Sequence, residues 1–534
     1  MTGLIETSAA LIDWQKLSYG TAVSALLIVV LLTELLLYVR HARVRAQQRK
    51  DLPPGPWPWP IVGNLPAVAN GNLQQLVAKF GPLMSLRLGS MPCVVVSTAE
   101  AVKELVRAND ERLSDRPETL SFRIITDYKT IATAPSPGKL WHKLRSFSAK
   151  ELLSSKRVAS YEGTRRDELS NMMHVLLEAS DKGEALNVKQ WLFKTVANSM
   201  TRMLVNKRIY HGNETNSYKE EVKEEFNRWL QDRKRYALAH LISDFVPWLR
   251  FFSETVQGWR PRLEAFVDRQ TVLGVKLLEL EKHRERGVEK EADSSYVPDF
   301  VDVMLKTPIT DGEVLEEEFL IKQAMEFFAA GTETSSTAIE WGLAELVAHP
   351  ELIKRAREEI DAVVGSDRLV QESDIPQLPF LQAVVKETFR VHSFSPLSIP
   401  RISTAPAEAF GYKIPSGTRI VFNLHAIHRD PAVYENPDKF DPDRFLLRHL
   451  DVNHLAAFDS FELIPFGVGR RMCPGFNLGN TVVHFILANL IHSYEWSVPP
   501  GGKLDMTEAM ITFALCLKNP LTLVPKHRDG FPAF

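Results

Sequence analysis

Helical spacing dominates the pattern of hydrophobic and polar positions along the 534-residue chain. Apolar residues recur every three or four positions, as on the buried face of a helix. This spacing predicts helices over 141–155, 165–180, 187–205, 218–240, 255–285, 313–348, 350–364, 376–391 and 475–493. Shorter runs predict strands over 83–88, 92–97, 408–413, 418–422 and, in two pieces, 511–524. We therefore expect a mainly α fold with small β-sheets.

An almost unbroken apolar run, TAVSALLIVVLLTELLLYV, occupies residues 21–39. It has about the 20 residues that a helix needs to cross the hydrocarbon of a bilayer. A basic cluster follows it: Arg40, Arg43, Arg45, Arg49 and Lys50. The positive-inside rule then places residues 1–20 in the lumen and everything after residue 40 in the cytosol. A cleaved signal peptide is the alternative, but the run lacks a basic start and a clear cleavage site.

The segment that follows is rich in proline, with five prolines in residues 52–60. Proline fixes φ and removes a backbone donor, so this stretch must be extended and stiff. We interpret residues 40–65 as a basic, proline-rich hinge, with a ligand for a partner domain as the alternative. No second linker is evident after it, and residues 66–534 are expected to form one catalytic domain.

Composition and charge narrow the class of protein. The chain is 45% hydrophobic and 24% charged, which is typical of a globular protein with a large core. Its net charge of −2 gives no sign of the concentrated basic surface that a nucleic-acid partner requires, so none is expected.

Three cysteines are present: Cys93, Cys473 and Cys516. Their odd number and wide separation argue against a disulfide framework and against a zinc cluster. Cys93 and Cys516 stand in strand-like runs and are expected to be buried and inert.

Cys473 has a different setting, in a loop with Gly467 and Gly469 before the helix predicted over 475–493. Pro474 suits the first position of a helix, so Cys473 is expected near an N-cap, where backbone amides stabilise a thiolate. Arg471 adds a nearby cation. These features leave three interpretations open: a metal or cofactor ligand, a nucleophile, or an inert residue.

The same loop resembles the cysteine-ligand loop of the cytochrome P450 family, Phe-x-x-Gly-x-Arg-x-Cys-x-Gly. Every fixed position is matched, by Phe466, Gly469, Arg471, Cys473 and Gly475. The resemblance extends from the proline-rich hinge to the carboxyl end. It implies the P450 fold, haem b as cofactor and Cys473 as the ligand of the haem iron.

Two further motifs carry the resemblance. Glu387 and Arg390 are similar to the family's Glu-x-x-Arg pair, and Arg444 to the arginine of its Pro-Glu-Arg-Phe segment; these three are expected to form a buried structural network. Asp443 replaces the glutamate of that segment and is expected to shorten its contact.

The resemblance also assigns residues to the haem propionates. Trp141 and Arg145 match the family's Trp-x-x-x-Arg helix, where a spacing of four places both on one face. By the same carry-over, Arg401 and Arg471 would hold propionates.

Ala330 to Thr334 resembles the family's oxygen-activating helix. Gly331 costs about 1 kcal/mol in a helix, which a close approach of something flat would justify. A threonine-rich surface turn is the alternative, but the preceding Phe327 and Phe328 favour burial. By the resemblance, Thr334 would position a water and a proton donor, and Glu333 would relay protons from solvent.

Several stretches resemble the plant microsomal branch of the family: PPGPWPWPIVGNL, AAGTETSSTAIEW, LPFLQAVVKETFR, HAIHRDPAVYENP and FELIPFGVGRRMCPG. The tract 394–401 is similar to flavonoid B-ring hydroxylases. The resemblance implies a monooxygenase in the endoplasmic reticulum membrane that inserts one oxygen atom from O2 into a small hydrophobic, phenolic or flavonoid-like substrate. Electrons would come from NADPH through NADPH–cytochrome P450 reductase.

Other outcomes stay open at this stage. Residues 110–130 and 225–250, expected to line the pocket, match no pattern, so terpenoids, fatty acids and amino-acid derivatives remain alternative substrates. An oxygen-independent haem-thiolate isomerase or dehydratase is a rival, although such members often lack the acid–alcohol pair that Glu333 and Thr334 provide. A membrane-tethered haem-binding protein without turnover is the rival from another class.

Overall fold

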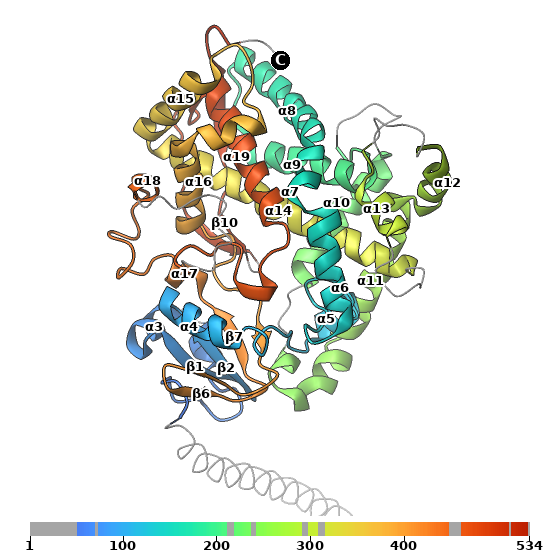
Figure 1. Ribbon diagram of the computed structural model, residues 1–534, viewed down its shortest axis with the longest axis vertical. Helices are drawn as coiled ribbons and strands as arrows, with labels where there is room; N and C mark the ends of the chain where they lie inside the picture. Colours follow the sequence, from blue (N-terminus) through green and yellow to red (C-terminus); the bar gives the residue numbers. More distant parts are fainter. Residues whose placement is uncertain are drawn as a thin grey trace, which may run out of the picture.

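The computed structural model describes residues 51–69, 73–210, 218–236, 242–290, 297–307, 316–447, 461–511 and 514–531. Over these ranges the chain is mainly helical with small sheets, as the sequence predicts (Figure 1). The predicted membrane segment, 21–39, lies outside the described residues. Within the described ranges, no helix has both the length and the apolar character of a membrane span.

A four-stranded sheet lies at one end of the molecule, beside α3 (Leu73–Phe80) and α4 (Ala99–Asn109) (Figure 1). Its order is β1–β2–β7–β4, and its strands are β1 (Leu83–Leu88), β2 (Met91–Val96), β7 (Arg419–Phe422) and β4 (Arg401–Ile402). Only the β2–β7 pairing is parallel among these strands. Cys93 lies in β2 and is 2% exposed, which confirms that it is a buried strand cysteine.

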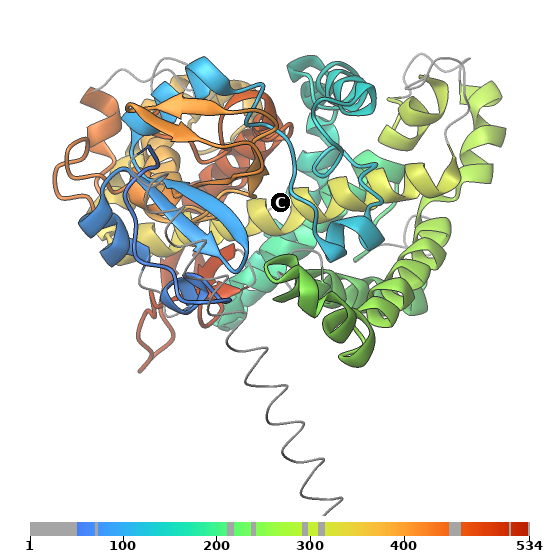
Figure 2. The same cartoon turned by 90° about the horizontal axis from the view of Figure 1, so that it is seen from below.

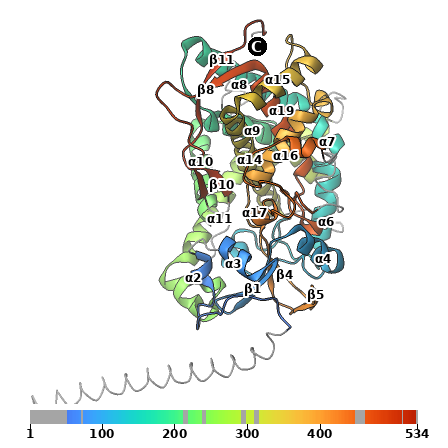
Figure 3. The same ribbon diagram turned by 90° about the vertical axis from the view of Figure 1, so that its left-hand side faces the viewer.

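Smaller sheets complete the β structure. The strands β3 (Leu186–Asn187), β11 (Thr522–His527) and β8 (Tyr494–Ser497) form a sheet at the opposite end of the molecule from the four-stranded sheet (Figure 3). Two hairpins pair β5 (Ala407–Ala409) with β6 (Tyr412–Ile414) and β9 (Glu508–Ile511) with β10 (Ala514–Leu517). Cys516 is buried in β10, as expected.

The longest described helix, α14 (Glu317–Ala348), crosses the centre of the molecule and joins its two halves (Figure 2). It packs against α9 (Val188–Val205), α11 (Trp259–Leu278), α16 (Pro379–Val391) and α19 (Phe476–Ser493). The contact with α19 is close, because a Cβ on Gly342 would stand 3.0 Å from Leu487 Cδ2. This helix therefore connects the cysteine loop, which precedes α19, to the rest of the core.

The remaining helices surround this centre: α2 (Leu65–Ala69), α5 (Leu120–Ile125), α6 (Lys139–Phe147), α7 (Ser155–Ser160), α8 (Glu162–Lys182), α10 (Glu220–Tyr236), α12 (Leu280–Lys290), α13 (Phe300–Lys306), α15 (Pro350–Val364), α17 (Leu424–Ile427) and α18 (Asp443–Leu447). A π-helical turn at Ser148–Leu152 follows α6.

Two predicted elements are divided in the structure. The helix expected over 255–285 breaks at Glu279, which has a left-handed φ of 42° and pairs with Lys207 at 2.7 Å and Lys282 at 3.1 Å. The strand expected over 408–413 is a hairpin, because Phe410 (φ 51°) and Gly411 (φ 73°) form its turn. In both places the backbone of a residue other than glycine adopts a left-handed conformation, which the hydrophobic pattern of the sequence does not reveal.

Candidate active site

The loop that carries Cys473 is shaped by positive backbone angles. Gly467 and Gly469 have φ values of 76° and 62°, which side-chain-bearing residues rarely adopt. A Cβ on Gly469 would collide with the Asp110 carboxylate, which accepts the Arg470 N–H at 2.8 Å. The Cys473 N–H closes the loop on the Phe466 carbonyl at 2.8 Å.

Cys473 lies two residues before Gly475, the N-cap of α19, so it is near the helix start as expected. The helix begins at Phe476, so the expectation that Pro474 occupies the first helical position is wrong by two residues. Burial raises the pKa of the Cys473 thiol, and the Gly475 N–H and the Arg145 cation oppose that shift. A cation bound directly to the sulfur would favour the thiolate further.

The α6 helix meets this loop with both of its predicted residues. Trp141 is 3% exposed, and its ring lies 4.6 Å from the Arg471 guanidinium. Arg145 donates from Nη1 to the Met472 carbonyl at 2.7 Å, one residue before the cysteine. The spacing of four brings both side chains to the cysteine loop, and their contact with a haem propionate stays a prediction.

Arg401 and Arg471 reach the same region from β4 and the cysteine loop. Arg401 pairs with Asp110 at 3.2 Å, and Arg471 donates from Nε to the Ser114 carbonyl at 2.7 Å. Burial lowers the pKa of each to about 10. A third arginine, Arg116, joins them and was missed by the sequence analysis.

Arg116 donates from Nε to the Ala132 carbonyl at 2.8 Å and from Nη1 to the Pro400 carbonyl at 2.9 Å. Burial and then repulsion by Arg471 and Arg401 lower its pKa well below the ordinary value. An arginine cluster whose members repel one another favours a bound anion. No local signal identifies Arg116, because its partners are distant in sequence.

The structural network predicted from the charged motifs is present. Arg390 and Glu387 pair through two contacts, at 2.6 and 2.8 Å, and both side chains are fully buried. Arg444 donates from Nε to the same Glu387 carboxylate at 3.0 Å. Asp443 lies outside this network and pairs with Arg355 at 2.7 Å, so the expected shortened contact is wrong. Its shorter side chain is directed to the partly exposed Arg355 instead.

Part of α14 is uncovered where the acid–alcohol pair stands. Between Phe319 and Leu346 the helix is buried except for Ala329, Ala330, Gly331, Glu333 and Thr334, and Ala330 is exposed. The alternative interpretation, a threonine-rich surface turn, is excluded because the helix is buried on both sides of this segment. A Cβ on Gly331 would lie 2.8 Å from Met200 Sδ, so this glycine permits close approach of α9.

Thr334 and Glu333 have different partners. Thr334 Oγ1 donates back to the Ala330 carbonyl at 2.7 Å, which turns the hydroxyl oxygen toward the uncovered segment of its own helix. Glu333 pairs with Lys234 of α10 at 2.9 Å. Sequence reasoning missed Lys234, which lies about one hundred residues away along the chain.

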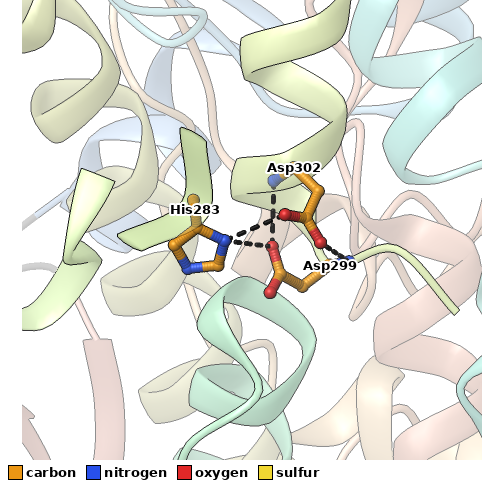
Figure 4. Close-up of side chains that lie close together, drawn as sticks. All are labelled: His283, Asp299 and Asp302. Atoms are coloured by element: carbon orange, nitrogen blue, oxygen red, sulfur yellow. Dashed lines mark hydrogen bonds and ion pairs between the residues drawn. The ribbon is translucent and has the colours of Figure 1, made fainter. Parts of the chain in front are cut away.

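Another buried polar cluster is structural. Asp299 and Asp302 cap α13 reciprocally, each accepting the backbone N–H of the other, at 2.9 and 3.1 Å (Figure 4). His283 Nδ1 lies 2.9 Å from Asp302. The histidine contact joins α12 to the start of α13. Capping of α13 explains why the two acids are buried there.

The arrangement fits a flat, dianionic cofactor. The residues from Gly469 to Asn477 are half-exposed, apart from the exposed Arg470, and they precede a helix that packs against α14. A thiol, four arginines and a tryptophan therefore gather around the partly accessible cysteine loop. Haem b offers an iron for the sulfur and two carboxylates for the arginines.

Comparisons with known proteins identify the family. The cytochrome P450 family model matches residues 53–524. A flavonoid 3'-monooxygenase of Crocosmia x crocosmiiflora is 35% identical over 95% of this chain and 98% of its own length. A flavonoid 3',5'-hydroxylase of Eustoma exaltatum subsp. russellianum is 36% identical over 91% of this chain and 92% of its own length.

A zebrafish cytochrome P450 structure with abiraterone has the same fold, with a TM-score of 0.67 and 24% identity over 86% of this chain and all of that chain. The chain belongs to the cytochrome P450 family. It is a haem-thiolate monooxygenase whose cofactor is haem b and whose electrons come from NADPH through a reductase.

Proposed function

We propose that this enzyme hydroxylates a flavonoid-like phenol, with Cys473 as the iron ligand. The similarity to flavonoid hydroxylases supports the substrate class. The observation that supports the site of oxidation is the uncovered segment of α14, where Ala330 is exposed beside Glu333 and Thr334 within an otherwise buried helix. Bound haem supplies the activation of dioxygen. The chain's own residues hold the cofactor, orient the substrate and deliver protons.

The cofactor-binding residues follow from the geometry around the cysteine loop. Arg145, Arg401 and Arg471 would neutralise the two propionates, with Trp141 packed beneath the Arg471 guanidinium. Arg116 belongs to the same set, because the charges of Arg471 and Arg401 repel its own. Their backbone contacts hold the guanidinium groups in place before the cofactor arrives, which reduces the entropy lost on binding.

Proton delivery rests on Thr334 and Glu333. The Thr334 hydroxyl, which donates to Ala330, has lone pairs that can accept a hydrogen bond from a water in the uncovered segment. Glu333 is partly exposed and held by Lys234, whose own side chain is 45% exposed. This ion pair extends from the uncovered segment of α14 toward solvent, which suits a proton relay.

We also propose that residues 21–39 anchor the chain in the endoplasmic reticulum membrane, with 40–65 as hinge and 66–534 as the cytosolic catalytic domain. The apolar run and its trailing basic cluster support this arrangement. It places the active site on the side of the membrane where a membrane-bound reductase can deliver electrons.

Turnover with a substrate panel tests the proposed reaction. The full-length enzyme is combined with NADPH–cytochrome P450 reductase and supplied with a flavanone, a monoterpene alcohol or a fatty acid under isotopically labelled dioxygen. We expect the flavanone to gain one labelled oxygen. A labelled product from another class alone would refute the substrate class, and an isomeric product without label would refute the monooxygenation of that substrate.

A further inference from the structure

A buried acid stands on α14 two turns before Thr334. Glu326 is 8% exposed, and its Oε1 accepts the Ala132 N–H at 3.1 Å. Within the described residues, its Oε2 has no hydrogen-bond partner. An unsatisfied carboxylate oxygen is costly in the interior, so a ligand or water that donates to it would be stabilised.

An arginine from the neighbouring helix approaches the same acid. α10 lies across α14, where the Phe226 and Phe328 rings are 4.6 Å apart and Lys234 pairs with Glu333. Arg233, next to Lys234, is half-buried, and its guanidinium lies 5.7 Å from the Trp229 ring. In the part of the chain that the structure describes, this guanidinium makes no hydrogen bond or ion pair.

The opposite charges of Arg233 and Glu326 act on one another. Burial lowers the pKa of Arg233, and the charge of Glu326 opposes that shift. Burial raises the pKa of Glu326, and a hydrogen bond with the Thr130 side chain, followed by the charge of Arg233, opposes that shift. An acid and a base that are near one another without a direct hydrogen bond can be bridged by a group that both donates and accepts.

The pair lies beside the uncovered part of α14. Glu326, Ala330 and Glu333 are spaced by four and three residues, so they share one face of the helix, and Ala330 between the two acids is exposed. Glu326 precedes Thr334 by eight residues, about 12 Å along the helix axis. That separation is close to the length of a three-ring phenolic molecule.

We propose that Arg233 and Glu326 recognise a phenolic hydroxyl of the substrate at the end remote from the oxidised carbon. This assignment rests on the proposed flavonoid-like substrate and names the group by which it is oriented. A phenol can donate to Glu326 Oε2 while its oxygen accepts from Arg233. A carboxylate at this position would be repelled by Glu326, and a hydrocarbon would leave both charged groups unsatisfied.

The sharpest test exchanges one acceptor for a donor. In Glu326→Gln, the Ala132 N–H keeps the amide oxygen at the Oε1 position, so the amide nitrogen replaces Oε2 and can no longer accept from a phenol. The matched control is Glu318→Gln on the same helix, where the glutamate is 56% exposed and pairs with Lys322. The ligands are naringenin and its 7-methyl ether, which lacks the donor.

Spin-state titration of the holoenzyme gives the dissociation constants. We expect the wild type and Glu318→Gln to bind the phenol about tenfold more tightly than the ether, as one charge-assisted hydrogen bond implies. Glu326→Gln should remove most of that preference. Arg233→Gln should weaken phenol binding about tenfold, while Arg235→Gln, an exposed neighbour on α10, should not.

The outcomes separate the two proposals. If Glu326→Gln retains the preference for the phenol, or lowers both affinities equally, the recognition role is refuted while the substrate class stands. If neither ligand shifts the wild-type spectrum and no flavonoid is turned over, the substrate class fails and the recognition role falls with it.

Discussion

At the scale of single residues, the proton-delivery role proposed for Thr334 can be tested through the use of reducing equivalents. Its hydroxyl sits in the uncovered segment of α14 and donates to Ala330 at 2.7 Å. If Thr334 positions a water as proposed, Thr334→Ala removes the hydroxyl that holds this water, and none of the residues proposed to bind haem is changed. We expect product formation per NADPH to fall by about 100-fold, with hydrogen peroxide formed instead, when both are measured in the reconstituted system.

A neighbouring threonine provides the control. Thr332 makes the same kind of hydrogen bond, from Oγ1 to the Phe328 carbonyl at 2.8 Å, but it is fully buried on another face of the helix. Thr332→Ala should keep product and NADPH consumption coupled. Full coupling in Thr334→Ala would refute the proton-delivery role.

At the level of elements, close packing of α11 on α14 depends on Gly274. A Cβ at this position would collide with Ile321 Cγ2, a buried β-branched side chain with little freedom to move. We expect Gly274→Ala to destabilise the protein by about 1–3 kcal/mol, measured as a lowered midpoint in thermal unfolding.

Gly163 in α8 is the matched control, because a Cβ there meets nothing within 4 Å. Gly163→Ala should leave stability unchanged or raise it by up to about 1 kcal/mol, since alanine is the better helix former. Equal effects of the two substitutions would contradict the packing of α11 against α14.

The sequence predicted elements well where one face is apolar, and less well where a turn or a distant partner decides. The helix over 350–364 matches α15, and that over 313–348 differs from α14 only at its start. The break at Glu279 was missed because its lysine partners stabilise a left-handed residue inside a helical pattern. Motif spacing likewise brought Trp141 and Arg145 to the cysteine loop, whereas Arg116, Lys234 and Arg233 carry no local signal, since their partners lie far along the chain.

For the whole molecule, the proposed anchor decides where the enzyme works. Residues 21–39 should retain the full-length protein in the membrane pellet after alkaline carbonate extraction. Val29→Arg combined with Val30→Arg should move it to the supernatant, because each central arginine costs about 2.5–3.5 kcal/mol. An intact wild-type chain in the supernatant, or a mature protein that begins after residue 39, would contradict the retained anchor.

The most direct test of the account concerns the sulfur of Cys473. The reduced carbon monoxide spectrum of the purified enzyme reports whether a thiolate is the iron ligand. We expect Cys473→Ala to lose the thiolate-type Soret band, while Cys93→Ala and Cys516→Ala, which change buried strand cysteines, keep it. Persistence of that band in Cys473→Ala would show that another residue holds the iron.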